Sequence, residues 1–260
     1  MDEKVSHFYD EWAQKKAKDE THEPVIRWKA REFARMLREV GMELHGRVLE
    51  IGCAEGILLS EFQKIFPEAE YNGVDISQEF VDRGRRRFPS LNLQRGDYRD
   101  VLQKEGQFDF IIASDLLEHL PDDDAFLREV LPHCDYFLLK LPLEICVYDS
   151  NPWVWTIRKL VGKTDREEFG PDHVDGHLRG YTVATARELV RRHELETIAE
   201  SVQAIQDFYD RSSVISLIQK VSERLCVHLF GGTFFTVTAS QAATNDAGRP
   251  QGTLSRGVTE

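Results

Sequence analysis

The chain has 260 residues, of which 41% are hydrophobic and 30% are charged, a composition typical of one globular domain, or of one domain with an added cap. The formal net charge of −12 argues against a large surface for nucleic acid or anionic lipid. The charged start Met1–Lys4 has no apolar signal segment, no apolar run approaches the ~20 residues of a membrane helix, and the four cysteines form no CxxC pair. These features predict a cytoplasmic protein with reduced thiols.

The first half of the chain alternates between strand and helix patterns. Residues 24–40 have apolar positions close to a 3.6-residue period, which predicts an amphipathic helix that Gly41 ends. The alternation after it predicts an α/β fold, a doubly wound and mostly parallel sheet. The predicted strands are 47–51, 71–75, 91–95, 108–114 and 135–141, and the predicted helices are 56–66, 77–88 and 122–131.

The regular alternation stops after the fifth strand. Residues 145–181 are predicted to be an inserted cap, partly helical near 152–161, because a structureless loop of this length is unusual in a compact domain. The polar end at 241–260 predicts a disordered tail. We therefore expect an N-terminal helical lid at 1–41 and a main domain at 42–240. Its last elements are a helix at 182–193, a strand at 195–204, a helix at 212–229 and a strand at 232–239.

Candidate binding residues follow the predicted strands, where open α/β sheets hold their ligands. The small-residue turn Gly52–Gly56 leads into a helix and offers backbone N–H groups to a nucleotide-like cofactor. Asp75, at the end of the second strand, can accept hydrogen bonds from two ribose hydroxyls, and Ile76 can lie flat on a base. Asp97 can accept from an exocyclic amine, with Tyr98 beside the base.

Four segments in order carry a family resemblance: Val48–Gly56, Gly73–Ser77, Gly96–Asp97 and Phe108–Asp122. Together they resemble the class I S-adenosylmethionine-dependent methyltransferases. His177–Thr182 and the helix after it resemble the small-molecule branch more weakly. The resemblance implies a seven-stranded Rossmann-like sheet, S-adenosyl-L-methionine as cofactor, and methyl transfer to an oxygen or nitrogen of a small acceptor, such as a sugar or natural-product-like compound.

The resemblance also assigns residues to the cofactor. It implies that Gly52 and Gly56 border the methionine part, that Glu50 holds the turn, and that Asp75 binds the ribose. Many such turns have glycine at the position of Ala54. This residue is therefore where the turn departs from the family pattern. The full set expected around the cofactor is Glu50, Gly52, Cys53, Ala54, Gly56, Asp75, Ile76, Asp97, Tyr98 and Ser114.

Acceptor-side chemistry is less visible in the sequence, because methyl transfer needs a base only when the acceptor is protonated. His119 follows the fourth strand, and His173 and His177 lie in the inserted cap. Tyr9 lies in a segment that resembles the N-terminal lid of many related enzymes. These four residues are the catalytic candidates, with Tyr181 a further one; ordinary packing is the competing interpretation for each.

Three alternatives remain at this stage. Asp115, Glu118, His119 and His177 have a spacing similar to the divalent-metal site of enzymes that methylate the terminal 2′-hydroxyl of small RNAs, although we predict no metal and the net charge disfavours RNA. The chain could be a non-catalytic cofactor-binding partner subunit that docks through the helix at 212–229. A nicotinamide-dependent oxidoreductase is disfavoured, because the turn lacks G-x-G-x-x-G spacing.

Overall fold

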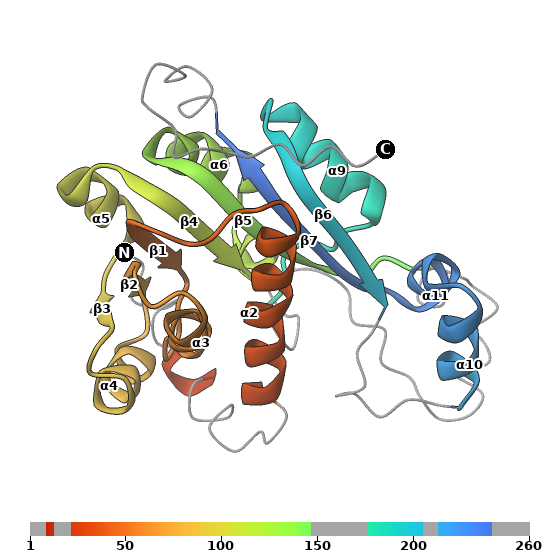
Figure 1. Ribbon diagram of the computed structural model, residues 1–260, viewed down its shortest axis with the longest axis horizontal. Coiled ribbons are helices and arrows are strands. Elements are labelled where there is room, and N and C mark those ends of the chain that lie inside the picture. Colours follow the sequence, from red (N-terminus) through yellow and green to blue (C-terminus); the bar gives the residue numbers. More distant parts are fainter. Residues whose placement is uncertain (1–8, 13–21, 147–175, 205–212, 241–260) are drawn as a thin grey trace.

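The protein is built on one seven-stranded mixed sheet, seen in a computed structural model that describes residues 9–12, 22–146, 176–204 and 213–240 (Figure 1). The strand order is β3-β2-β1-β4-β5-β7-β6. The pairs from β3 through β5 are parallel, whereas β7 runs antiparallel to both β5 and β6. The strands are β1 (Arg47–Ile51), β2 (Glu70–Asp75), β3 (Asn92–Arg95), β4 (Phe108–Ser114), β5 (Cys134–Leu143), β6 (Glu196–Ala204) and β7 (Gly232–Ala239).

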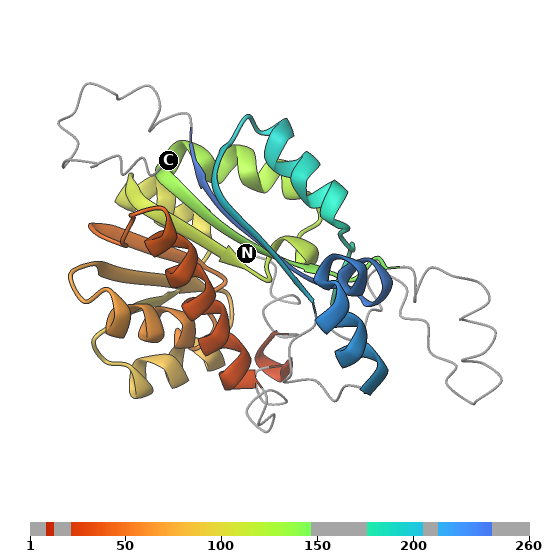
Figure 2. The ribbon, with the colours of Figure 1, turned by 45° about the vertical axis from the view of Figure 1, so that its right-hand side comes forward.

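Helices cover both faces of this sheet (Figure 2). Side chains of α2 (His22–Glu39), α3 (Ile57–Ile65) and α4 (Gln78–Arg87) pack in one hydrophobic cluster. Side chains of α5 (Tyr98–Glu105), α6 (Asp123–Val130) and α9 (Val183–Arg192) pack in a second. The remaining described elements are α10 (Ser213–Val221), α11 (Glu223–Phe230) and the short 3₁₀ helices η1 (Leu117–His119) and η2 (Leu131–His133).

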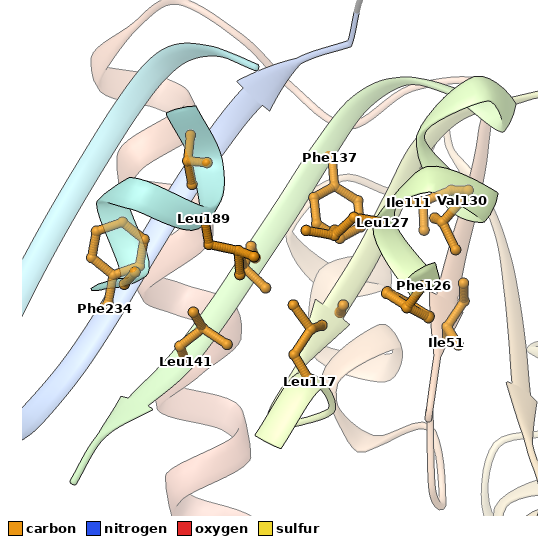
Figure 3. Close-up of a cluster of buried hydrophobic side chains, with 14 of the residues drawn as sticks. Ile51, Ile111, Leu117, Phe126, Leu127, Val130, Phe137, Leu141, Leu189 and Phe234 are labelled. Carbon is orange, nitrogen blue, oxygen red and sulfur yellow. The ribbon is translucent and has the colours of Figure 1, made fainter. Parts of the chain in front are cut away.

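The second cluster shows how the sheet is held beneath the site (Figure 3). The strand side chains Ile111 and Phe137 lie beside the α6 side chains Leu127 and Val130, and all four are completely buried. Burying a side chain of this size typically contributes about 1.5–3 kcal/mol. The strands therefore form a rigid base, and their carboxyl ends can hold functional groups in fixed positions.

The structure confirms the predicted doubly wound, seven-stranded sheet and corrects three details. The segment Tyr98–Glu105 is a helix that the sequence analysis did not predict, and β5 is longer than the predicted 135–141. The predicted single helix at 212–229 is wrong: it is α10 and α11, separated at Ser222. Ser222 has an extended backbone (φ −158°) and its hydroxyl accepts from the N–H of Leu225, so it caps α11 instead of continuing α10.

Most of the predicted cap at 145–181, the whole tail at 241–260 and much of the predicted lid at 1–41 lie outside the described residues. Within the described part, residues 9–12 are helical and α2 packs directly on α3. No helix among the described residues has both the length and the apolar character needed to cross a membrane.

Candidate functional site

The site lies where the chain reverses its direction of travel across the sheet. β1 and β4 are neighbours, but the chain continues from β1 toward β2 and β3, and from β4 toward β5. At such a switch point the carboxyl ends of the strands border a crevice between the connecting loops. The predicted residues Gly52, Asp75, Asp97 and Ser114 follow or end the four strands at this edge.

The turn after β1 is fixed by bonds to the end of β2. The N–H groups of Gly52 and Cys53 donate to the carbonyl of Val74, at 2.9 and 3.2 Å. Gly52 (φ 75°) and Gly56 (φ 75°) have left-handed backbones, which glycine adopts readily. Ala54 also lies in this region (φ 45°), so the methyl group at the irregular position is accommodated.

Asp75 ties the turn to the next helix. Its carboxylate accepts from the N–H of Ala54 and from the N–H of Ser77, both at 2.8 Å. Burial raises the pKa of Asp75 to about 6, although these backbone hydrogen bonds oppose the rise. Asp75 is therefore mostly ionised at neutral pH, and each of its oxygens can accept a further hydrogen bond.

Two more buried polar groups lie at this edge with unsatisfied atoms. Among the described residues, Glu50 Oε2 and Ser114 Oγ have no hydrogen-bond partner. Burial, and then the charge of Asp75, raise the pKa of Glu50, whereas Lys29 lowers it. Burial also raises the pKa of the Cys53 thiol, so Cys53 is a packing residue of the turn and not a thiolate.

These groups fit S-adenosylmethionine. The cofactor carries a sulfonium cation, an ammonium group and ribose hydroxyl donors, and the edge offers carboxylates and an unsatisfied buried oxygen to receive them. Glu50, Asp75 and Ser114 would therefore hold the cofactor, which supplies an activated methyl group when bound.

The third strand end has its own hydrogen bonds. Asp97 is the N-cap of α5, and its Oδ1 accepts from the N–H of Arg99 at 3.0 Å. The Tyr98 hydroxyl donates to Glu129 at 2.6 Å, and Ile76 is half-buried. Asp97 thus caps α5, and its predicted bond to adenine remains a proposal.

Asp115 is held by two lysines, which the sequence analysis did not identify. Its carboxylate forms ion pairs with Lys29 of α2 and with Lys140 of β5. Burial alone would raise the pKa of Asp115, but Lys140 and then Lys29 outweigh burial and hold this pKa well below its usual range. Glu118, His119 and His177 form a group of metal-binding type that does not include Asp115, the fourth residue of the disfavoured metal alternative.

The structure brings three of the acceptor-side candidates together. The ring of Tyr9 meets His119 edge-on, with 6.0 Å between centroids, and His119 meets His177 at 4.8 Å. Burial, and then the neighbouring His177, lower the pKa of His119 to about 4, so His119 is neutral at pH 7. Burial strongly raises the pKa of Tyr9, with further contributions from Asp75 and Glu118.

The two remaining candidates differ from this group. Tyr181 is buried and its hydroxyl donates to Asp123 at 2.8 Å, so it anchors the start of α6. His173 lies outside the described residues. The sequence analysis missed the two lysines that pair with Asp115. The signal for Lys140 is a single charge in the apolar run 136–141, whereas the sequence gives no signal for Lys29.

Comparison with known proteins agrees with this geometry. Residues 48–135 match the family model of the methyltransferase domain. The chain is 27% identical over 90 residues to trans-aconitate 2-methyltransferase of Deinococcus radiodurans, covering 34% of each chain. It is 33% identical over 86 residues to fatty-acid O-methyltransferase of Mycolicibacterium smegmatis, covering 32% of this chain and 31% of the relative. The matches thus span about a third of these relatives.

The fold is also that of solved methyltransferases. A SAM-dependent methyltransferase from Archaeoglobus fulgidus superposes with a TM-score of 0.53 at 18% identity, covering 84% of this chain and 94% of that one. The strand order defines a Rossmann-like fold, in which ligands are held at the switch point where the acids and the glycine turn lie. Residues 48–135 of the chain thus match a methyltransferase domain, and the chain has the fold of a solved SAM-dependent methyltransferase.

Proposed function

We propose that this chain transfers the methyl group of S-adenosylmethionine to an oxygen, or to a nitrogen, of a small-molecule acceptor. The observation that carries the proposal is the position of Tyr9. Its ring contacts His119, and its hydroxyl is close enough to Asp75 and Glu118 for both acids to raise its pKa. Tyr9 therefore connects the cofactor edge with the histidine group, where an acceptor would meet the donated methyl.

For methyl transfer, the protein must align the acceptor with the donor's methyl group and, for some acceptors, provide a base. Methyl transfer is an in-line displacement at the sulfonium, and holding the reactants in line can lower the barrier by about 7–11 kcal/mol. A hydroxyl acceptor is protonated near neutral pH and must lose its proton as the methyl arrives. His119 is neutral at that pH and can accept this proton, which favours oxygen over nitrogen as the methylated atom.

The remaining roles follow from the positions of the groups. We assign the turn Gly52–Gly56 to the methionine part of the cofactor, Asp75 to the ribose, Ile76 to one face of adenine and Asp97 to its amino group. We propose that Tyr9 covers the site and that His177 orients the ring of His119. The net charge of −12 supports a small acceptor over RNA.

Calorimetry with S-adenosylmethionine and with its demethylated product tests the cofactor half of this proposal. We expect micromolar binding that Asp75→Ala abolishes or weakens strongly. The control is Asp100→Ala, at an exposed position in the first turn of α5, which should bind as the wild type does. Absence of binding by the wild type, or equal binding by both variants, would contradict the assignment.

A turnover assay tests the acceptor half. The purified chain is incubated with the donor and a panel of hydroxyl, carboxyl and amine compounds, and release of the demethylated donor is measured. We expect release with at least one small molecule. A chain that binds the donor but releases product only in complex with a second protein from its host would instead be a cofactor-binding subunit.

A further inference from the structure

The large apolar side chains that remain exposed in the described part of the chain lie on α10, on α11 and after the end of β5. They are Leu217 and Val221 of α10, Leu225 of α11, and Ile145 just beyond β5, with exposed fractions of 63%, 77%, 45% and 41%. Leu217 and Val221 are four residues apart and therefore share one face of α10. Single exposed apolar residues are ordinary on a protein surface, but a group of them marks a binding surface. We call these four residues the apolar patch.

The path of the chain places the apolar patch at the same edge of the sheet as the candidate site. β5 and β6 both pair antiparallel with β7, so β6 runs in the same direction as β5 and its carboxyl end lies at the edge of the site. α10 and α11 connect that end of β6 to the start of β7. Both ribbon views show α11 beside the end of β5 (Figure 1 and Figure 2). Adjacent strands are about 4.8 Å apart, so the start of β7 lies about 10 Å from the end of β4.

A short run of contacts joins the apolar patch to the proposed base. The ring of His119 contacts the ring of His177, whose Nδ1 lies 2.8 Å from Glu144 Oε2. Ile145 of the patch is the next residue in the chain. α11 meets the same segment from the other side, because an added Cβ atom at Gly231, directly after α11, would overlap a carbonyl oxygen of β5. The apolar patch is therefore continuous with the acceptor side of the site.

The composition of the apolar patch limits what can cover it. Its four members offer no hydrogen-bonding side chain, and the exposed charges beside them, Lys220, Glu223 and Arg224, are of mixed sign. Four partly exposed side chains provide well under the roughly 800 Å² per partner that a stable protein–protein interface buries. A hydrocarbon chain needs only a narrow apolar strip, and it gains free energy by leaving water. These properties favour a single hydrocarbon chain over a second protein.

We propose that the acceptor carries a hydrocarbon chain and that the apolar patch binds this chain. The polar end of the acceptor lies at His119, and the chain extends past Ile145 to α10 and α11. Methylation of the polar end rests on the proposed function, whereas binding of the chain does not. Burial of one methylene strengthens binding up to about fourfold, and contact with a one-sided surface about twofold. Because the chain does not touch the reacting atoms, it stabilises ground state and transition state alike and should lower KM without changing kcat.

Binding of unbranched primary alcohols to the full chain tests the inference. Equilibrium dialysis with 1-hexanol, 1-octanol and 1-decanol should show an affinity that rises about twofold per methylene. The triple variant Leu217→Gln, Val221→Gln and Leu225→Gln should bind 1-decanol at least tenfold more weakly. The matched control replaces the same three residues by methionine, which keeps the patch apolar, and should bind as the wild type does. All three positions are exposed, so neither variant should disturb the fold. Affinity that does not rise with chain length, or equal binding by the glutamine variant and the wild type, overturns the proposal.

Two further measurements separate this inference from its alternatives. Light scattering should give the same mass in solution for the wild type and the glutamine variant; a dimer that the variant dissociates would assign the patch to a second copy and overturn the proposal. In turnover with hydroxyl acceptors of increasing chain length, KM should fall while kcat stays constant. Turnover that is indifferent to chain length contradicts this inference alone. Binding of 1-decanol through the patch by a protein that transfers no methyl group to any acceptor contradicts the proposed function alone.

Discussion

At the scale of single residues, Asp75 combines a structural role with its proposed role in cofactor binding. Its two backbone bonds hold the turn after β1, and each of its carboxylate oxygens can accept one more hydrogen bond. Asp75→Asn keeps the size of the side chain but removes the charge. A hydrogen bond to a charged group contributes about 1.5–3 kcal/mol, so we expect donor affinity to fall about 10-fold to 150-fold. Calorimetry measures this loss, and equal affinity in wild type and variant would show that Asp75 serves only the turn.

The raised pKa of Asp75 also predicts a pH dependence of donor binding. The carboxylate is the form that accepts from ribose hydroxyls and attracts the cationic donor, and burial places its pKa at about 6. Affinity should therefore be constant from pH 8 to 7 and decline as the pH falls through about 6. Asp75→Asn should remove this decline, because it has no proton to gain. A wild-type profile that is flat down to pH 5 would contradict the assignment.

His119 is the residue at which acceptor chemistry can be separated from donor binding. His119→Gln retains a polar side chain but removes the imidazole, and loss of a general base typically reduces turnover about 10²-fold to 10⁴-fold. Donor affinity should stay within about twofold, because the variant leaves the turn and Asp75 unchanged. The matched control is His193→Gln, whose imidazole is bonded to Asp124 beside α9. Full turnover in His119→Gln with a hydroxyl acceptor would exclude His119 as the base.

At the scale of elements, α4 lies unusually close to the cofactor turn, and Gly84 permits this approach. A Cβ atom at Gly84 would lie 2.6 Å from the carbonyl oxygen of Glu55 and 2.6 Å from Leu93 Cδ1. Both distances are shorter than a normal contact, so an added methyl group must displace the helix or the turn. The small residue at this position therefore sets the distance between α4 and the site.

We expect Gly84→Ala to destabilise the protein despite the better helix propensity of alanine. Overpacking costs typically about 1–3 kcal/mol, while replacing a helix glycine contributes up to about 1 kcal/mol in the opposite direction. Urea unfolding should thus show a net loss of up to about 2 kcal/mol. The control is Gly96→Ala, where the nearest atom to a new Cβ is Val74 Cγ2 at 4.0 Å. A Gly84→Ala protein as stable as this control would refute the packing argument.

The elements also show how far the sequence predicts this fold. Long apolar runs such as Phe108–Ser114 identify central strands, because both faces of a parallel sheet are buried. The helix Tyr98–Glu105 escaped prediction because it is short and buries only Val101 and Leu102. The division between α10 and α11 was missed because the helical spacing of apolar residues continues across Ser222. In predicting a helix from sequence, that spacing outweighs a single possible capping residue.

The sequence predicts those residues of the site that directly follow the ends of strands. Parallel strands bring their carboxyl ends to one edge, so Gly52, Asp75 and Ser114 could be grouped from the sequence alone. Lys29 could not, because it reaches Asp115 across 86 positions through the packing of α2, and packing has no local signal. The support of His177 by Glu144 depends in the same way on a tertiary contact.

At the scale of the whole molecule, one charge cluster joins three distant parts of the chain. Asp115 after β4 pairs with Lys29 of the N-terminal helix α2 and with Lys140 of β5. The exposed fractions of these side chains are 25%, 14% and 7%, so the pairs are largely shielded from water. The backbone of Asp115 has a φ of 52°, an unfavourable value for a residue with a side chain. The ion pairs thus hold a strained residue at the edge of the proposed cofactor site.

This charge cluster predicts that removing the carboxylate of Asp115 destabilises the protein more than removing the ammonium of Lys140. Asp115→Asn leaves the buried Lys140 ammonium without the carboxylate that it contacts, and breaking a buried pair in this way costs about 3–5 kcal/mol. We expect a loss near the lower end, about 3 kcal/mol, because Asp115 is a quarter exposed. Lys140→Met instead removes the buried charge, keeps a similar volume and leaves Asp115 paired with Lys29, so its stability should change by less than about 1 kcal/mol.

Urea unfolding of the two variants at pH 7 measures this difference, and its pH dependence identifies the cause. The pKa of Asp115 is lowered in the folded state, so its contribution is fully present above its ordinary pKa of 3.8 and is lost as the pH falls below that value. The gap between wild type and Asp115→Asn should therefore stay constant from pH 7 to 5 and narrow below about 4. Equal losses in Asp115→Asn and Lys140→Met would mean that shape, and not the unpaired ammonium, determines the cost. A large loss in Asp115→Asn alone would establish that α2, β4 and β5 are held together by charge at the edge of the site.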